Sequence, residues 1–335
     1  MATNKIRVAI NGFGRIGRAA FKILLEDKKY QVVAINDLAP TESLAYLLKY
    51  DTVYGSYDKK VEAKGKNIAV AGKKYSITAI PEPKKLPWKK MKVDVVLECT
   101  GRFVKGNASY AHLRAGAQKV IMSAPAKGGN TQTFLLGVNQ EKYNKQKVVS
   151  NASCTTNCVA PVAQIMVAKF GVEKAMMTTI HSYTADQALV DGPHKKDFRR
   201  GRSAAENIIP TTTGAALATS LVVPELKGLF DGLAIRVPTP IVSLSDFTFL
   251  LKKKVTPKQV NQALITASKS KRYKGILGVT DQPVVSSDFI GDERSSIVDL
   301  SLTKVVGGNM VKIIAWYDNE WAYSKRLVEM INSII

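Results

Sequence analysis

A glycine-rich turn near the N-terminus constrains the fold of this chain more than any other feature. The turn is Gly12-Phe13-Gly14-Arg15-Ile16-Gly17, and it follows an apolar run at 6–10. The stretch 16–25 after it carries apolar residues at helical spacing. A strand, a glycine turn and a helix in this order are typical of a βαβ unit that binds a pyrophosphate. We expect Gly12 to permit the tight turn, Gly14 to let the backbone approach the phosphates, and Gly17 to let helix and strand pack closely.

An acidic residue stands where such a unit places its ribose ligand. Asp37 comes about 20 residues after Gly17, at the end of the β-branched run 31–36. A carboxylate there accepts hydrogen bonds from an adenosine ribose and repels a 2′-phosphate, which favours NAD over NADP. Alone, Asp37 reads equally well as a loop residue or a helix cap before Pro40. Together with the turn, the strand and the helix, it predicts a dinucleotide site.

The two halves of the chain differ in pattern. The residue pattern of the first half predicts strands at 6–10, 31–36, 93–98, 119–122 and 148–150. It predicts helices between them at 16–25, 41–49 and 106–116. Short antiparallel strands are expected within 61–80. The second half predicts helices at 154–170 and 320–331, another starting at Thr256, and long β runs at 175–183, 233–237, 241–251 and 310–317. The expected fold class is α/β: a Rossmann-type doubly wound parallel sheet, then an α+β domain with a mixed or antiparallel sheet.

Composition excludes several classes of protein. A chain of 335 residues that is 45% hydrophobic has packed cores and is long enough for two domains. Three cysteines exclude a disulfide scaffold and indicate a reducing compartment, and with only three histidines no structural zinc site is expected. No uncharged apolar stretch of about 18 residues occurs, so no membrane insertion is expected. The N-terminus also lacks the apolar region of a signal peptide, so the sequence predicts a cytoplasmic protein.

The charge is strongly basic. Lysine and arginine number 49 against 27 acidic residues, a formal net charge of +22. Such a surface attracts phosphorylated metabolites, polyanions or acidic lipid, although solubility explains it equally well. A nucleic-acid-binding or polyanion-binding protein is therefore the alternative from a different functional class. No RNP-like, zinc-finger or helix-turn-helix signature supports it as the main activity.

One cysteine has the surroundings of a nucleophile. Cys154 lies within Ser153-Cys154-Thr155-Thr156-Asn157-Cys158, a polar segment followed by an apolar run that is typical of a helix start. The positive end of the helix dipole lowers the pKa of a thiol placed there. Cys158, further along that helix, and Cys99, at the end of an apolar strand, read instead as small buried hydrophobes.

Elimination favours His181 as the base that serves this thiol. His112 falls within the expected helix 106–116, and His194 lies in the basic run 192–202. His181 is near the end of the β run 175–183, in the same half of the chain as Cys154. A structural histidine remains the alternative reading.

Several residues suit a phosphate group. They are Thr211, Thr212, Thr213 and Gly214 before an expected helix, the loop arginines Arg199, Arg200 and Arg202, and Arg236 within the β run 233–237. An arginine in an apolar strand needs an anionic partner. A solvated basic surface is the alternative for the loop cluster, and a buried structural ion pair is the alternative for Arg236.

At these residues the sequence resembles the phosphorylating glyceraldehyde-3-phosphate dehydrogenases. Matching segments run nearly end to end, at 10–18, 150–158, 179–184, 207–210, 213–216, 236–239 and 316–320. The segment 153–158 is the specific one. The resemblance implies NAD-dependent oxidative phosphorylation of D-glyceraldehyde 3-phosphate by inorganic phosphate, which gives 1,3-bisphosphoglycerate through a thiohemiacetal and a thioester. Erythrose-4-phosphate dehydrogenase is the related alternative.

The resemblance implies a role for each site residue. Cys154 adds to the aldehyde, and His181 activates the thiol and assists proton transfer. Cofactor contacts fall, besides the three glycines, on Arg15, Ile16, Asp37, Ser123 and Asn319. The site for attacking inorganic phosphate falls on Ser153, Thr155, Thr213 and Gly214. The site for the substrate's own phosphate falls on Thr184 and Arg236. One arginine of the loop, Arg199 or Arg200, should also bind phosphate.

The resemblance also implies the domain organisation and the assembly. An NAD-binding domain spans 1–152, a catalytic domain spans 153–318, and a closing helix at 319–335 packs back on the NAD-binding domain. Members of the family are typically homotetramers. The chain departs from the family in three ways. Pro81-Glu82-Pro83 removes an adenine-side arginine, Trp321-Ala322 replaces a more usual aromatic-glycine pair, and the charge of +22 is high. Weak polyanion binding therefore stays open as a side activity.

Overall fold

The computed structural model describes residues 5–335, which fall into two compact units. The first unit comprises the chain up to Leu135, Gln140–Ala152 and Ser324–Ile335, and the second comprises Leu136–Asn139 and Ser153–Tyr323. The prediction that the N-terminus is no signal peptide rests partly on residues 1–4, which lie outside the described residues. Among the helices of residues 5–335, none is long and apolar enough to cross a membrane.

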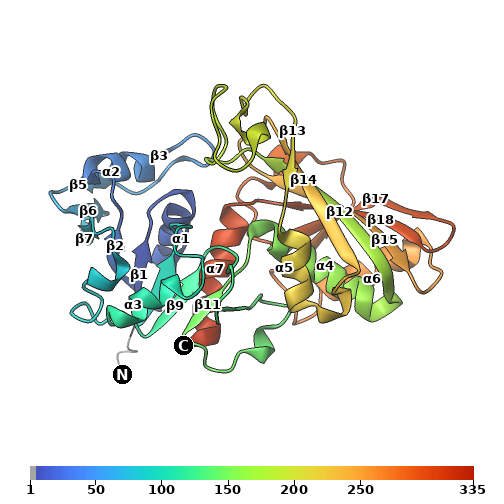
Figure 1. The fold of residues 1–335 in the computed structure, drawn as a ribbon, viewed down its shortest axis with the longest axis horizontal. Helices are drawn as coiled ribbons and strands as arrows, with labels where there is room; N and C mark the ends of the chain where they lie inside the picture. The colour runs from blue at the N-terminus through green and yellow to red at the C-terminus, as the bar shows by residue number, and fades with distance from the viewer. Residues whose placement is uncertain (1–4) are drawn as a thin grey trace. The chain divides into compact units, whose positions relative to one another are not determined.

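A nine-stranded sheet forms the centre of the first unit, in the order β10-β11-β9-β8-β1-β2-β7-β6-β5 (Figure 1). Its parallel part comprises β1 (Ile6–Asn11), β2 (Tyr30–Asn36), β8 (Val95–Glu98), β9 (Lys119–Met122), β10 (Gln132–Thr133) and β11 (Val148–Ser150). At the other edge, β5 (Val61–Ala63), β6 (Asn67–Val70) and β7 (Lys73–Thr78) pair antiparallel, and β7 joins β2 in parallel. A small hairpin of β3 (Tyr50–Asp51) and β4 (Gly55–Ser56) stands apart from this sheet.

Both faces of this sheet are covered. Helix α1 (Arg15–Glu26) packs on the face of Ile10, whose side chain lies next to Gly17. The opposite face carries Ala9 and Val96, which pack with the fully buried Trp88. Helix α2 (Thr41–Lys49) packs near β5 and β6. The Rossmann-type prediction is therefore confirmed for this unit.

The helix predicted at 106–116 is wrong in length. Only a 3₁₀ turn at Ala108–Tyr110 and the short helix α3 (Ala111–Arg114) form there. The start of the segment is not helical, because Gly106 has a left-handed φ of 54° and its N–H donates to the carbonyl of Lys127. A helix start needs those backbone groups in a different conformation.

The second unit is built on a mixed sheet of seven strands in the order β13-β14-β12-β15-β18-β17-β16. The strands are β12 (Val172–Ser182), β13 (Ile209–Thr212), β14 (Phe230–Val237), β15 (Ser243–Leu251), β16 (Leu277–Thr280), β17 (Ser296–Val306) and β18 (Met310–Tyr317). The pairs β12–β14 and β16–β17 are parallel and the other pairs are antiparallel. The predicted mixed sheet is thus confirmed, although the sequence analysis did not anticipate β13, β16 or β17.

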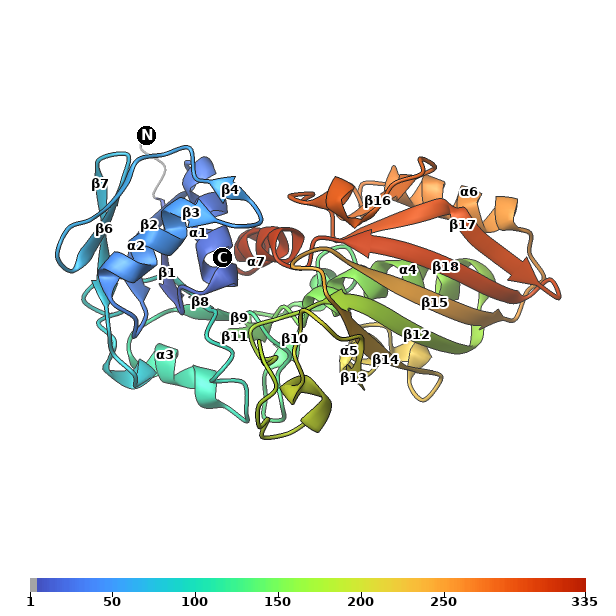
Figure 2. The same ribbon diagram turned by 90° about the horizontal axis from the view of Figure 1, so that it is seen from above.

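Three helices lie in a row against one face of this sheet (Figure 2). They are α4 (Cys154–Phe170), α5 (Ala215–Val222) and α6 (Pro257–Ser268). The predicted cap of α6 is present, because Thr256 and Gln259 form a reciprocal capping box. The chain closes with α7 (Trp321–Ile334), whose residues from Ser324 onward belong to the first unit.

The glycine turn places its three glycines in different surroundings. Gly12 has φ +93°, and a Cβ there would meet backbone atoms of Cys99 and Thr100 at 2.8 Å. A Cβ on Gly17 would overlap the carbonyl oxygen of Gly12. A Cβ on Gly14 would meet nothing within 4 Å, so only Gly14 has open space beside its backbone.

We predict that Gly17→Ala destabilises the protein while Gly14→Ala folds normally. The added methyl group at Gly17 meets a backbone oxygen that cannot move freely, and overpacking of this kind costs roughly 1–3 kcal/mol. The measurement is the free energy of unfolding in denaturant. Equal stability of the two variants would contradict the close packing of α1 on β1.

Candidate active site

Cys154 is the first residue of α4, as the sequence predicted. Ser153 is the N-cap, and its Oγ accepts the N–H of Thr156 at 3.0 Å. Asn157 adds a second bond across the first turn, from Nδ2 to the carbonyl of Ser153 at 2.9 Å. Ala152, just before the cap, takes a left-handed conformation with φ 53°. Cys154 as a residue is intermediate in exposure, whereas Cys158 is buried.

The structure brings His181 to this thiol. His181 lies near the end of β12 and is buried, and its Nε2 is 3.6 Å from Sγ of Cys154. Its Nδ1 is 2.7 Å from the carbonyl oxygen of Ser182. Because a carbonyl only accepts, Nδ1 carries the ring proton and Nε2 presents its lone pair toward the sulfur.

The other two histidines have different partners. His112 is fully buried in the first unit between Trp88 and Glu98. In the second unit, Nδ1 of His194 accepts the backbone N–H groups of Lys196 and Asp197. Both have structural partners, so His181 remains the histidine that faces a thiol.

The electrostatics of the pair differ from the sequence expectation in one respect. Burial, followed by the nearby Arg236 guanidinium, lowers the pKa of His181 to about 3, so the imidazole is neutral at neutral pH. Burial also raises the pKa of the Cys154 thiol, against the opposing effect of Arg236. The expectation that the helix terminus favours the thiolate is therefore wrong, because loss of hydration outweighs Arg236 and the hydrogen bonds at the start of the helix. The resting pair is a thiol beside a neutral base.

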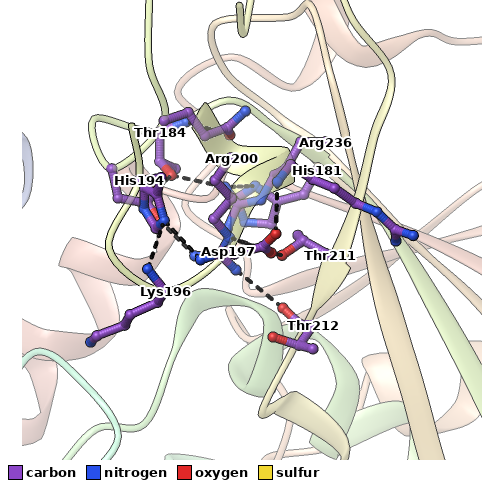
Figure 3. Close-up of polar contacts among 12 residues, drawn as sticks. His181, Thr184, His194, Lys196, Asp197, Arg200, Thr211, Thr212 and Arg236 are labelled. Carbon is purple, nitrogen blue, oxygen red and sulfur yellow. Dashed lines mark hydrogen bonds and ion pairs between the residues drawn. The ribbon is translucent and has the colours of Figure 1, made fainter. Parts of the chain in front are cut away.

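A network of two arginines extends from His181 (Figure 3). Nη1 of Arg236 lies 3.2 Å from Nδ1 of His181 and donates to the carbonyl of Ser182 at 3.0 Å and to Oγ1 of Thr184 at 2.9 Å. The Thr184 hydroxyl in turn donates to Asp186. Asp186 accepts Nη1 of Arg200 at 2.6 Å, so two guanidinium groups flank one carboxylate.

The two adjacent loop arginines lie in different surroundings. Arg200 belongs to this network and also donates from Nε to Oγ1 of Thr211 at 2.9 Å. Arg199 is exposed and lines a separate surface hollow with Lys196 and Phe198.

A buried tyrosine that the sequence analysis missed lies beneath the pair. The hydroxyl of Tyr317 is 3.0 Å from Oγ1 of Thr155 and 2.9 Å from Oγ1 of Thr179, and Thr179 donates to the carbonyl of Leu244. Since each hydroxyl has one proton, Tyr317 donates to Thr179 and Thr155 donates to Tyr317. The Tyr317 ring also meets the His181 ring edge to face. Its only sequence signal is a tyrosine inside an apolar strand, whose hydroxyl must find a partner.

The remaining expected residues of the second unit are mostly held by bonds within their own segments. Thr213 accepts the N–H of Ala215 at 3.2 Å, and Gly214 is the N-cap of α5, which packs against α4. Oδ1 of Asn319 accepts the hydroxyl of Ser243 at 3.0 Å.

A pocket of about 290 Å³ lies in the first unit at the carboxyl ends of β1, β2 and β8. Its lining includes Gly12, Gly14 and Asp37. The Asp37 carboxylate accepts the N–H groups of Phe13 at 2.7 Å and Ala39 at 3.0 Å, so it also ties the glycine turn in place. The open side of Gly14 and an acceptor at the strand end fit a dinucleotide.

Three expected cofactor residues have other contacts. Arg15 pairs with Asp51 at 3.1 Å beside the ring of Tyr54. The carbonyl of Ile16 lies 3.5 Å from the hydroxyl of Ser324, and the N–H of Ser123 donates to the carbonyl of Glu98. No group of histidine, cysteine and carboxylate side chains that could hold a metal occurs within residues 5–335.

These features are typical of one class of protein: a dehydrogenase with a nucleotide-binding sheet and a cysteine next to a histidine. Residues 6–106 match the family model described as glyceraldehyde 3-phosphate dehydrogenase, NAD binding domain, and residues 153–319 match the model of its C-terminal domain. The chain belongs to the glyceraldehyde 3-phosphate dehydrogenase family, and NAD is the cofactor of its first domain.

Curated relatives cover nearly the whole chain. It is 51% identical over 327 residues to the glyceraldehyde-3-phosphate dehydrogenase of Geobacillus stearothermophilus, covering 97% of each chain. It is 52% identical over 331 residues to that of Priestia megaterium, covering 98% of each. The protein of the same name from Zymomonas mobilis is 48% identical over 327 residues, again 97% of each. The resemblance on which the sequence analysis relied is confirmed.

We predict that Arg236→Met slows alkylation of Cys154 by iodoacetamide roughly tenfold near neutral pH. Arg236 lowers the pKa of the Cys154 thiol. Without that cation the thiol stays protonated to higher pH, and the curve of rate against pH moves to higher pH. Arg199→Gln, which removes an exposed arginine, is the control. A faster reaction of Arg236→Met would show that the cation does not stabilise the thiolate.

Proposed function

We propose that this chain catalyses the oxidative phosphorylation of D-glyceraldehyde 3-phosphate by NAD⁺ and inorganic phosphate to 1,3-bisphosphoglycerate. The observation that carries the proposal is the 3.6 Å approach of the Cys154 sulfur to the unprotonated Nε2 of His181. The arginine pair in the same unit supports it, because a phosphorylated substrate needs a cationic subsite. Identity of about half the residues to curated dehydrogenases of this name supports the same substrate.

In the first step, Sγ of Cys154 bonds to the aldehyde carbon and its proton passes to Nε2 of His181. The low pKa of His181 makes the imidazolium a strong acid. It therefore gives the proton directly to the alkoxide, and the product is a neutral thiohemiacetal.

In the second step, His181 takes the hydroxyl proton of the thiohemiacetal as the carbonyl of the thioester forms. NAD⁺, when bound, accepts the hydride that leaves the same carbon. The glycine turn and Asp37 would hold its pyrophosphate and ribose, with Arg15, Ile16, Ser123 and Asn319 as further contacts. In the third step, hydrogen phosphate attacks the thioester carbon and the C–S bond breaks. Cys154 leaves as thiolate and recovers a proton from His181, and the proton of the phosphate passes to solvent.

Two anion subsites serve these steps. We assign the substrate's own phosphate to Thr184, Arg236 and Arg200, since Arg200 and not Arg199 joins the network beside His181. Nε of Arg236 supports this, because it is buried and has no hydrogen-bond partner among residues 5–335. We assign inorganic phosphate to the starts of α4 and α5, with Ser153, Thr155, Thr213 and Gly214.

The domain organisation and assembly complete the proposal. We assign NAD binding to 1–152, catalysis to 153–318, and a closing role to the helix at 319–335. A homotetramer is supported by exposed Met176 and Leu233, which lie on the sheet face that the helices of the second unit leave uncovered. The three cysteines are free, which supports a location in the reducing cytoplasm. Exposed lysines at 84–85 and 89–90 support weak binding of polyanions, because they carry positive charge on the surface.

The function is tested by Cys154→Ser in an absorbance assay for reduced nicotinamide. Wild-type protein should reduce NAD⁺ faster than NADP⁺, only with phosphate present, and faster with glyceraldehyde 3-phosphate than with erythrose 4-phosphate. Cys154→Ser should lose oxidation but keep the Kd for NAD⁺ within about twofold, because a hydroxyl is a far weaker nucleophile. Cys158→Ala, which changes a buried cysteine of the same helix, is the control. Normal turnover of Cys154→Ser would overturn the assignment.

The choice between the two arginines gives a matched pair of variants. Arg200→Gln should raise KM for glyceraldehyde 3-phosphate roughly tenfold or more, since a charge-assisted bond to phosphate is lost. Arg199→Gln should change KM by less than about twofold, because an exposed charge contributes little. Steady-state kinetics at saturating NAD⁺ and phosphate measures both. The reverse order would move the subsite to Arg199.

A further inference from the structure

A buried carboxylate stands behind the wall of the nucleotide pocket. Glu98 is the last residue of β8 and is 2% exposed. Its Oε1 accepts the N–H of Thr100 at 2.9 Å and also the Thr100 hydroxyl. Its Oε2 accepts Nδ2 of Asn11 at 2.5 Å and lies 2.8 Å from Nε2 of His112. Asn11 and Thr100 both line the pocket.

Trp88 fixes the direction of the hydrogen bonds in this cluster. Its indole Nε1 can only donate, and it lies 2.9 Å from Nδ1 of His112. Nδ1 of His112 therefore accepts, Nε2 carries the ring proton, and that proton is donated to Glu98. Four donors thus converge on the carboxylate, two on each oxygen. Only a group without a proton of its own can occupy this position.

The orientation set by Glu98 continues along the strand ends. Because Nδ2 of Asn11 donates to Glu98, its Oδ1 faces Nδ2 of Asn36 and accepts from it at 2.7 Å. Oδ1 of Asn36 then accepts the hydroxyl of Thr78 at 2.8 Å and the N–H of Ile80 at 2.9 Å. Asn36 and Ile80 line the same pocket. Glu98 therefore fixes which way the Asn11 amide points, and the Asn36 amide, which the backbone N–H and carbonyl of Ile80 also orient, fits that direction.

We propose that Glu98 is a positioning residue of the dinucleotide site, acting through the orientation that it imposes on Asn11 and the Thr100 turn. The inference rests on the proposed function only in taking NAD as the pocket's ligand. A glutamine has the same shape, but its NH₂ group faces two donors whichever way it turns. Either the Thr100 side or the Asn11–His112 side of the cluster must then lose its bonds, and the pocket wall changes.

The test compares the two ends of one strand in the full-length protein. Glu98→Gln should raise the Kd for NAD⁺ roughly tenfold by calorimetry. Asp94→Asn is the matched control, because Asp94 stands just before β8 and accepts the N–H of Arg7 and Nε2 of Gln118, far from the pocket lining. It should leave the Kd within about twofold, as expected for a partly exposed pair.

Further readouts separate positioning from general loss of stability. In Glu98→Gln, KM for NAD⁺ should rise while kcat at saturating NAD⁺ and the alkylation rate of Cys154 stay within about twofold. The ¹⁵N spectrum of only three imidazoles should show His112 protonated at Nε2 in the wild type and changed in the variant. If Glu98→Gln does not fold, Thr100→Val is tested in its place. It removes one hydrogen-bond donor to Glu98 from the partly exposed residue Thr100, and it should also raise the Kd for NAD⁺.

The outcomes are distinct. Unchanged Kd in folded Glu98→Gln, or in Thr100→Val where the first variant does not fold, overturns the inference. An equal rise of the Kd for NAD⁺ in Asp94→Asn also overturns it, and so does a wild-type protein that does not bind NAD⁺. A wild type that binds NAD⁺ but does not oxidise the aldehyde overturns the proposed function alone, and the ratio of Kd values then still decides the role of Glu98.

Discussion

The chemistry of the second unit depends on the hydrogen bond from Nδ1 of His181 to the carbonyl of Ser182. This bond holds the ring proton on the nitrogen away from the sulfur, so Nε2 presents its lone pair to Cys154. The strand makes the arrangement rigid, because β12 is paired with β14 on one side and β15 on the other. The same parallel register sets His181 opposite Arg236. One strand pairing therefore places the Arg236 cation next to His181, the proposed base.

That pairing has an electrostatic consequence. Arg236 and Arg200 both act to lower the pKa of His181, so the site without an anion holds a weak base. A phosphate dianion bound between the two guanidinium groups opposes their field, and the imidazole then accepts a proton more readily. In the network as it stands, Asp186 supplies part of that negative charge. In the proposed mechanism, the substrate's own phosphate would therefore strengthen His181 as a base.

Local signals explain what could be predicted from the sequence. The glycine turn before α1 and the Ser153 cap before α4 are short-range patterns, and both helices begin within a residue of the prediction. Strand β17 lacks such a signal, since polar residues and a register shift between Asp299 and Lys304 interrupt its alternation. Tyr317 reaches Thr155 across 162 residues, a contact that no local pattern encodes. The pKa of Cys154 depends on burial by such distant contacts, which is why the helix-start argument gave the wrong direction.

Two histidines of this chain show how a partner that can only accept, or only donate, a hydrogen bond decides which ring nitrogen carries the proton. A carbonyl next to Nδ1 of His181 forces the proton onto that nitrogen and frees Nε2 for a thiol. An indole next to Nδ1 of His112 forces the proton onto Nε2 and directs it into a carboxylate. The first ring can accept a proton, whereas both nitrogens of the second are already committed. Position in the chain suggested His181 as the base, and the hydrogen bond at its Nδ1 is the physical reason for proposing it.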